Sequence, residues 1–295
     1  MIQNNNLSVL PFYTALDEQN HRKSYAYGET YPLYSPSEQL LPFQILIEHS
    51  AAAFSVTDAY VYRFGDDVIV ASIKQELLDG GLQRLQYTQY GYDVIIYPSF
   101  VPMGTELLEG RYYVRLRTSV GTFYSEVFTV VDQLSPYLKI EWWSEEDLVG
   151  DAWRIVYPYN DMQFKNRLYL CTELGKPDYE FEEEGEQRDG FYFPEKQISE
   201  KTYRFTILAP EYLCDVMRFI RMADNIVITD KYGRQYRCDT FLMTPKWQTQ
   251  GDLASVECEF TTDTVAKVIG HALPPRGQLG AYNQDYNDDY DITNI

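Results

Sequence analysis

The sequence predicts a mostly β protein, in which an N-terminal immunoglobulin- or fibronectin-like β-sandwich is followed by a second β-rich domain carrying one α-helix. Three features of the 295-residue chain support this fold class. Short runs of branched and aromatic residues recur between turn-forming residues. The hydrophobic content of 45% and aromatic content of 16% suffice to fill real cores, which excludes a wholly disordered chain. Helical periodicity is confined to one segment, residues 210–220.

Residues 1–40 are predicted to form an extended N-terminal arm. Prolines and a glycine interrupt this segment and favour an extended path. Its second half contains the tyrosines Tyr25, Tyr27, Tyr31 and Tyr34. These side chains need a surface to cover, which is either the chain's own first domain or a neighbouring subunit.

Residues 41–135 are predicted to form the β-sandwich. Apolar runs alternate here with good turn formers, such as Gly65-Asp66-Asp67 and Asp79-Gly80-Gly81. The first five strands are expected at residues 44–48, 59–63, 68–73, 82–88 and 94–97.

The clearest strand pair comes at the end of this domain, where side chains alternate between two faces. The set expected to face the core is Tyr112, Val114 and Leu116. The set expected to face outward is Arg111, Tyr113, Arg115 and Arg117. A turn at 119–121 then leads into a strand at 122–131. This pair resembles the last hairpin of an immunoglobulin or fibronectin-type sandwich, although the Cys-Trp-Cys signature is absent.

Residues 136–270 are predicted to form the second domain, with Ser135-Pro136 as the boundary. Its first strands are expected at residues 138–143, 153–157, 167–172, 179–183, 190–193 and 202–208. Asp189-Gly190 is a strong hairpin signal between two of these strands.

One helix is expected to begin at Pro210, which suits a first helical position, with Glu211 complementing the helix dipole. Its core-facing stripe is Leu213, Val216, Met217 and Ile220. The helix is expected to end near residues 224–225. A hairpin at 226–229 and 234–242 then follows, and alternating Ala254, Val256, Cys258 and Phe260 complete the domain.

The net charge of −19 excludes the usual basic footprint of nucleic-acid or anionic-membrane binding. Residues 1–135 carry −7 and residues 136–270 carry −9, so neither domain hides a basic segment. Residues 271–295 carry −3 and form an acidic tail rich in tyrosine, asparagine and aspartate, which cannot build a core. We therefore expect no direct nucleic-acid binding. The absence of an export signal and of a long apolar run predicts synthesis in the cytoplasm and no membrane insertion.

The four cysteines are expected to be free, buried thiols, with a disulfide as the alternative. They are Cys171, Cys214, Cys238 and Cys258. None forms a Cys-x-x-Cys pair or has a histidine at ligand spacing, so no zinc site is predicted. The sequence also lacks the glycine-rich nucleotide-binding motifs and the Gly-x-Ser-x-Gly motif of hydrolases. The three histidines lie on separate segments, which disfavours a Ser-His-Asp triad.

Three acidic segments carry residue types that could support chemistry. Residues 142–147 read Trp-Trp-Ser-Glu-Glu-Asp, and glycoside hydrolysis needs paired carboxylates beside aromatic platforms. The competing interpretation is a strand end with Trp142 in the core, followed by an acidic turn. Residues 182–184 and the tail aspartates offer oxygen ligands for calcium, but neither matches a calcium loop, and solvated charge is the simpler interpretation.

Several stretches together resemble tail-associated virion proteins of gut bacterial phages and prophages, including crAss-like ones. They are residues 193–205, 209–212, 236–239 and 251–260, and the opening segment, residues 10–43, shows a similar resemblance. The resemblance implies a β-rich subunit of a tail, neck or baseplate without enzymatic activity. It implies contacts with neighbouring subunits rather than a catalytic site, so no family site residues are carried over.

We therefore expect a virion structural protein that forms a homo-oligomeric ring and contacts other virion proteins, with no catalytic, cofactor-binding or metal-binding residues. The candidate subunit-interaction residues are Tyr25, Tyr27, Tyr31, Tyr34, Tyr282, Tyr286 and Tyr290. The alternative is a carbohydrate-binding β-sandwich module for host recognition, with glycan contact through exposed tryptophans such as Trp143, Trp153 and Trp247.

Overall fold

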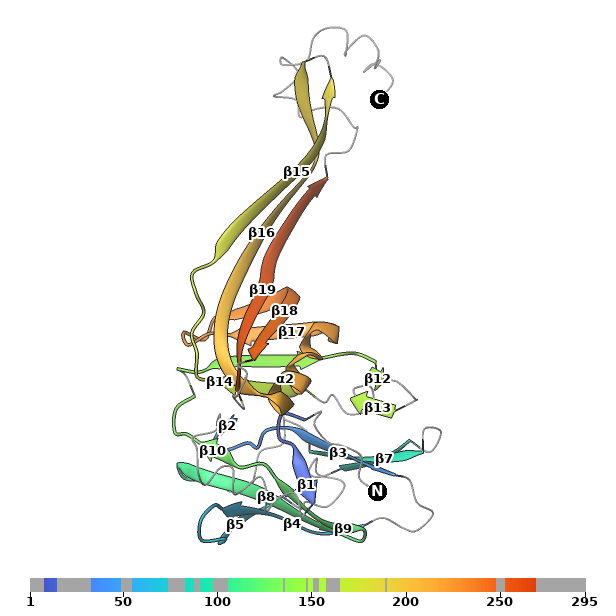
Figure 1. The fold of residues 1–295 in the computed structure, drawn as a ribbon, viewed down its shortest axis with the longest axis vertical. Coiled ribbons are helices and arrows are strands. Elements are labelled where there is room, and N and C mark those ends of the chain that lie inside the picture. Colours follow the sequence, from blue (N-terminus) through green and yellow to red (C-terminus); the bar gives the residue numbers. More distant parts are fainter. Residues whose placement is uncertain are drawn as a thin grey trace, which may run out of the picture. The chain divides into compact units, whose positions relative to one another are not determined.

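The fold is mostly β, as predicted, and the described residues of its second part include one α-helix (Figure 1). The computed structural model describes residues 8–14, 33–48, 55–73, 83–87, 91–97, 106–134, 136–146, 148–150, 154–157, 165–188, 190–247 and 253–268. The chain divides into two compact units. The first comprises residues 1–178 and 201–263, and the second comprises residues 179–200 and 264–295.

The first sheet of the sandwich has seven strands. The path β1-β9-β8-β10-β2 is hydrogen-bonded in that order, and β9 and β10 pair with different ends of β8. The strand β4 also pairs with β8, and β5 pairs with β4. The strands are β1 (Phe12–Thr14), β2 (Leu33–Ser35), β4 (Val56–Arg63), β5 (Ile69–Ser72), β8 (Gly110–Thr118), β9 (Gly121–Ser125) and β10 (Phe128–Val130). The second sheet contains β3 (Phe43–Glu48), β7 (Tyr92–Tyr97) and β6 (Gln83–Tyr87), in that order.

The sandwich core lies between these two sheets. Phe12 of the first sheet packs on Phe43 of the second, with ring centroids 4.6 Å apart. Phe43 in turn stacks on Tyr97 at 5.5 Å, and all three side chains are buried. The core-facing set expected in β8 is confirmed, because Tyr112, Val114 and Leu116 are buried.

Two features identify the sandwich as immunoglobulin-like. The strand β2 runs parallel to β10, whereas the neighbouring pairs of β8 with β4, β9 and β10 are antiparallel. Near the start of β8, the Tyr112 hydroxyl donates a hydrogen bond of 2.8 Å to the carbonyl oxygen of Leu108. A tyrosine that bonds back to the preceding corner in this way is a hallmark of the immunoglobulin architecture.

Two details of this sandwich differ from the sequence-based expectation. Tyr113 is buried rather than outward and exposed, because its ring stacks on Tyr62 and its hydroxyl donates to Asp67. The strand expected at 122–131 is divided into β9 and β10. At the break, the Ser125 hydroxyl accepts the Val114 N–H in place of a ladder partner.

The second seven-stranded sheet has the order β14-β11-β17-β18-β19-β16-β15. Its strands are β11 (Leu138–Trp143), β14 (Asn166–Leu170), β15 (Asp178–Arg188), β16 (Phe191–Pro210), β17 (Asn225–Thr229), β18 (Gln235–Trp247) and β19 (Leu253–Val268). A separate two-stranded sheet pairs β12 (Leu148–Gly150) with β13 (Arg154–Tyr157). The strands expected at 190–193 and 202–208 are wrong as separate elements, since both belong to the 20-residue β16.

The helix α2 (Glu211–Met217) follows β16 directly, and its predicted stripe is confirmed. Leu213, Val216 and Met217 are fully buried, as is Ile220 of the 3-10 helix η3 (Ile220–Met222). The α-helix ends earlier than the expected 224–225. Its last turn tightens, because Phe219 donates its N–H to Val216, three residues back, rather than to the fourth residue back.

The predicted arm and both predicted domains meet within the first unit. Val9, Leu10 and Leu33, which belong to the predicted 1–40 arm, are buried in the common hydrophobic core. The Arg167 guanidinium donates to Gln39 at 2.7 Å across the 135–136 boundary, and to Glu141 at 2.9 Å within the predicted second domain. Burial opposes ionisation of Glu141, but Lys139 and Arg167 outweigh it and lower the pKa of this carboxyl.

Candidate interaction surface

The described part of the second unit consists of β15 from Tyr179 on, β16 up to Glu200 and the last residues of β19. No described side chain between residues 178 and 200 is buried. The described part of this unit is therefore a β-ribbon whose strands are paired and whose side chains are exposed or half-buried.

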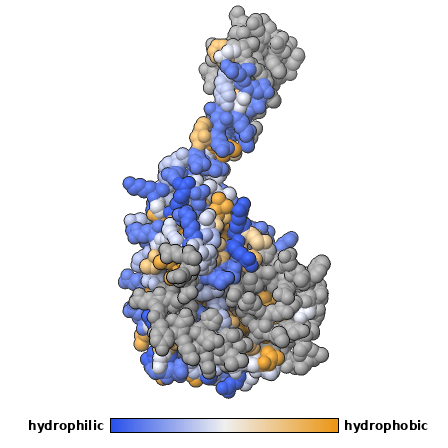
Figure 2. Space-filling view, viewed as in Figure 1, coloured by the Kyte–Doolittle hydropathy of each residue, from blue (hydrophilic) through white to orange (hydrophobic). Residues whose placement is uncertain are grey.

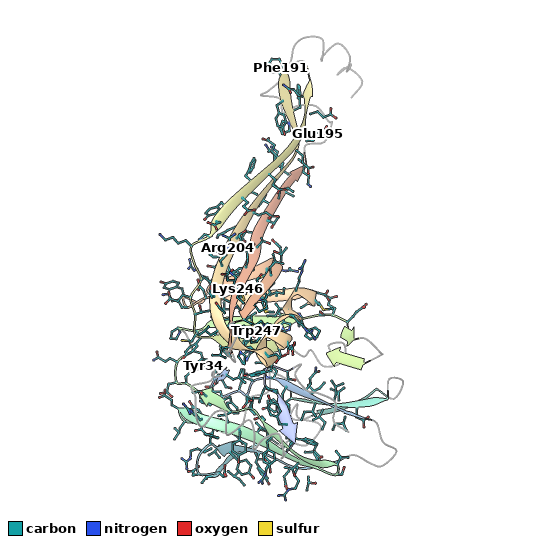
Figure 3. The ribbon with its side chains drawn as sticks, in the orientation of Figure 1. Tyr34, Phe191, Glu195, Arg204, Lys246 and Trp247 are labelled. Atoms are coloured by element: carbon teal, nitrogen blue, oxygen red, sulfur yellow. The ribbon has the colours of Figure 1, made fainter. Side chains whose placement is uncertain are left out.

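Four large aromatic side chains are well exposed on this ribbon. They are Tyr179, Phe181, Phe191 and Tyr192, each between 51% and 73% exposed. Phe191, labelled in Figure 3, follows the turn residue Gly190, whose φ of 82° is in the left-handed region. β15 and β16 are paired on either side of the predicted Asp189-Gly190 hairpin, and Gly190 has the expected turn conformation. Asp189 lies outside the described residues.

Carboxylates dominate the rest of the ribbon. Residues 179–200 contain eight acidic and two basic residues, a net charge of −6. Glu183 accepts a 2.6 Å bond from the Gln197 amide, and Glu184 lies 4.0 Å from the Lys196 ammonium. In Figure 2 this ribbon, located by β15 and β16 in Figure 1, is mainly hydrophilic with isolated hydrophobic patches.

Gly185 allows the two strands of the ribbon to approach closely. A Cβ atom at this position would lie 2.2 Å from the carbonyl oxygen of Phe193 and 2.9 Å from the Cα of Pro194. Only glycine fits such an approach.

A second surface lies in the first unit, on the outward face of β16, β19 and β18. Arg204 bonds to Glu259 at 2.6 Å and also contacts Asp178, while Lys246 bonds to Glu257 at 2.6 Å (Arg204 and Lys246 are labelled in Figure 3). The exposed Leu208 and Leu242 accompany these ion pairs. Unlike the ribbon, this face has its charges largely paired.

Of the seven predicted interaction tyrosines, the structure describes Tyr34 alone. Tyr34, labelled in Figure 3, is half-buried in β2, and its ring centroid lies 4.5 Å from that of Tyr137. Burial, Tyr137 and Cys171 together raise the pKa of Tyr34 to about 12. Tyr34 thus contacts its own chain at the boundary between the two predicted domains. The other six tyrosines, Tyr25, Tyr27, Tyr31, Tyr282, Tyr286 and Tyr290, lie outside the described residues.

The patch considered for glycoside hydrolysis lies at the end of β11. Trp142 is fully buried and therefore cannot serve as a sugar platform. Glu145 is exposed, and its backbone N–H donates to the Asp224 carboxylate. The backbone N–H of Asp224 in turn donates to the Ser144 hydroxyl oxygen. Reciprocal bonds of this kind anchor the strand end to the segment before β17.

The remaining candidate groups are also placed by the structure. Among the residues it describes, no group of three histidine, cysteine, aspartate or glutamate side chains has an arrangement that could hold a metal ion. All four cysteines are free. Cys171 is exposed rather than buried as expected, because it follows the last residue of β14. Within the described segments, no helix has the length and apolarity needed to cross a membrane.

The tryptophans proposed for glycan contact differ in accessibility. Trp247 is about half exposed at the end of β18 (Figure 3). The Lys165 ammonium lies 4.1 Å from the ring centroid of Trp143 and covers one of its faces. Trp153 lies outside the described residues.

Comparison with known proteins gives a likeness among the solved structures. No family model and no curated protein matches the chain. Among the solved structures that match is a chain from the crystal structure of the ZIG-8–RIG-5 IG1–IG1 heterodimer, monoclinic form. It is 12% identical, with a TM-score of 0.16, and the match covers 36% of this chain and 89% of that one.

Proposed function

We propose that this chain is a non-enzymatic structural subunit of a phage virion, in the tail, neck or baseplate, and that it assembles through contacts with copies of itself and with other virion proteins. The observation that carries the proposal is the β-ribbon of the second unit, which exposes four large aromatic side chains and buries none.

A ribbon of this kind gains little stability from its own side chains. The ribbon belongs to the seven-stranded sheet, but its outer part has no buried apolar face, and a hairpin without such a face is marginally stable in water. At roughly 200 Å² per aromatic side chain, the four exposed rings present about 500 Å² of surface. This is more than half of the ~800 Å² that each partner buries in an interface of standard size. Contact with a neighbouring protein would supply the missing burial.

The ring arrangement is supported by the presence of two chemically different surfaces. A closed ring of identical subunits needs two distinct patches on each copy, because its contacts are heterologous. The paired-charge face around Leu208 and Leu242 and the acidic, aromatic ribbon differ in this way. The resemblance to tail-associated virion proteins favours a virion as the assembly.

Mass spectrometry of purified particles tests the proposal. The protein is expected in the particles at a stoichiometry that matches a ring. The double variant Phe191→Ser/Tyr192→Ser should reduce its incorporation, whereas Tyr232→Ser, at an exposed tyrosine of the first unit, should not. A virion preparation that contains no copy of the wild-type protein would refute the assignment.

Glycan binding is the second candidate function, favoured by the half-exposed Trp247. Aromatic platforms stack on sugar rings, and a protein displayed on a particle could contact host surface glycans. A glycan array should then give hits that Trp247→Ala abolishes. An array without hits, or hits that survive the substitution, would remove this candidate.

A further inference from the structure

We propose that β15 is a docking edge for an extended segment of a different protein, in which lysine or arginine alternates with apolar residues. The inference rests on the proposed role as an assembly subunit and specifies the chemistry of one partner. The docked segment would add a strand to the ribbon beside β15.

The position of β15 makes such an addition possible. It is the last strand in its sheet, with β16 as its neighbour among the described residues. It is 11 residues long, and an edge strand presents backbone N–H and C=O groups that can pair with another chain. Recognition by strand addition uses these main-chain bonds for affinity and alternate side chains for specificity.

The two faces of β15 differ in chemistry. Successive side chains of a strand point to opposite faces, so Glu180, Glu182 and Glu184 share one face and Tyr179 and Phe181 share the other. The carboxylates repeat every ~6.7 Å, twice the rise per residue of a strand. A partner strand has the same repeat, so basic residues at alternate positions would each lie beside one carboxylate, with apolar residues beside the two aromatics.

The acidic face is poorly neutralised within the ribbon. The Glu184–Lys196 contact is long, at 4.0 Å, and both side chains are well exposed, so it is a weak pair. Within the described residues, the structure gives Glu180 and Glu182 no ion pair. A basic partner strand would therefore meet carboxylates whose charges are still available.

The charge of the chain itself disfavours two other occupants. A second copy of β15 would place glutamates opposite glutamates, and like charges across a strand pair are destabilising. The chain's own residues 271–295 carry four aspartates and one arginine, so they would add negative charge beside negative charge. The complementary strand therefore belongs to a different, basic protein.

A fluorescent nine-residue peptide that alternates lysine with valine provides the probe, titrated with the full-length protein and followed by anisotropy. The triple variant Glu180→Gln/Glu182→Gln/Glu184→Gln should weaken binding about tenfold, as three cross-strand charge pairs contribute roughly twofold each. The control variant Asp132→Asn/Glu145→Gln/Glu146→Gln removes the same charge from exposed positions of the first unit and should leave affinity unchanged.

Two altered peptides separate strand addition from simple charge attraction. A peptide of the same composition with its lysines in one block, and a fully N-methylated version that donates no backbone hydrogen bonds, should both bind at least about tenfold more weakly. Equal binding of all three peptides, or equal loss in both protein variants, would overturn the proposal. A change in oligomeric mass in the triple variant without peptide would assign the edge to another copy and overturn it as well.

The binding assay is independent of the virion assignment. Peptide binding that behaves as expected, with the protein missing from particles, would remove the proposed function and leave the docking edge. Incorporation into particles without any peptide binding would remove the docking edge and leave the proposed function.

Discussion

The carboxylate of Asp230, at the turn between β17 and β18, is expected to be a major determinant of stability. Its Oδ1 accepts the N–H groups of Tyr232 and Arg234, both at 2.9 Å. Its Oδ2 accepts the Arg234 side-chain Nε–H at 2.7 Å and the Tyr236 hydroxyl at 3.2 Å. The side chain is only 6% exposed, so these bonds replace almost all of its contact with water.

Asp230→Asn should keep the bonds to the two backbone N–H groups. It would replace Oδ2 with an NH2 group, which would face the Arg234 Nε–H and the Tyr236 hydroxyl that now donate to Oδ2. A hydrogen bond to a charged group contributes about 1.5–3 kcal/mol, and a buried donor left unmatched adds a penalty of similar size. We expect a loss of about 3 kcal/mol. At roughly 2–4 °C per kcal/mol, this lowers Tm by about 6–12 °C.

The loss should depend on pH in the acid range. Burial opposes ionisation of Asp230, but the N–H groups of Arg234 and Tyr232 and the Arg234 guanidinium outweigh it and lower the pKa of the carboxyl. A lowered pKa stabilises the fold fully above the unfolded value of about 4, and the contribution is lost as the pH falls through the folded pKa. The Tm difference between wild type and Asp230→Asn should therefore be constant from pH 7 to 5 and shrink below about pH 4.

Thermal denaturation followed by circular dichroism measures these effects. The set of proteins is wild type, Asp230→Asn, Arg234→Gln and the double variant. The two single losses should not add, because both remove the same ion pair. A Tm difference below about 2 °C at pH 7, or additive losses, would refute the assigned role of this carboxylate.

Three further outcomes are expected. Phe241→Ala should cost about 3–5 kcal/mol, because its ring is fully buried, whereas Leu242→Ala on the opposite face should cost under ~0.5 kcal/mol in the same melt. Gly185→Ala should accelerate amide hydrogen exchange of residues 179–200 at least about tenfold, because the new Cβ would overlap the Phe193 carbonyl. The control Glu182→Ala should leave the exchange rates unchanged. Equal exchange rates in the two variants would contradict this prediction. Burial raises the pKa of the Cys214 thiol to about 11 and those of the Cys238 and Cys258 thiols to about 12. At pH 8 a thiol reagent should therefore modify Cys171 rapidly and the other three cysteines only on unfolding. Equally fast modification of all four thiols would contradict the burial of Cys214, Cys238 and Cys258. Raised thiol pKa values stabilise the fold fully below about pH 8.5, so Tm should fall as the pH rises above that value.

Elements with one buried face were predictable from the sequence. In β19, Ala254, Val256, Cys258 and Phe260 alternate with polar residues and are all buried. The helical stripe at residues 213–220 was equally clear, because a helix that covers a sheet repeats its apolar positions every three or four residues. In both cases burial itself imposes the period that the sequence displays.

Elements without a buried face were not predictable in the same way. Between residues 194 and 200 both faces of β16 are partly exposed, so the chain shows no period, and the sequence divided one strand into two. The strands β1 and β2 have three residues each and are defined by pairing with β9 and β10. A run this short carries no recognisable pattern of its own.

The sequence by itself determined the fold class, the helix, the acidic character of every segment and the alternation of glutamate and aromatic residues around Phe181. Only the tertiary structure decided that Tyr34 packs on Tyr137, and that the described residues between 179 and 200 form a ribbon in which none of the described side chains is buried. Local patterns report which face of a strand is apolar, since that face must be buried. Which strand lies beside another, and which edge remains open, depends on long-range backbone pairing, and this leaves no mark on the order of side chains.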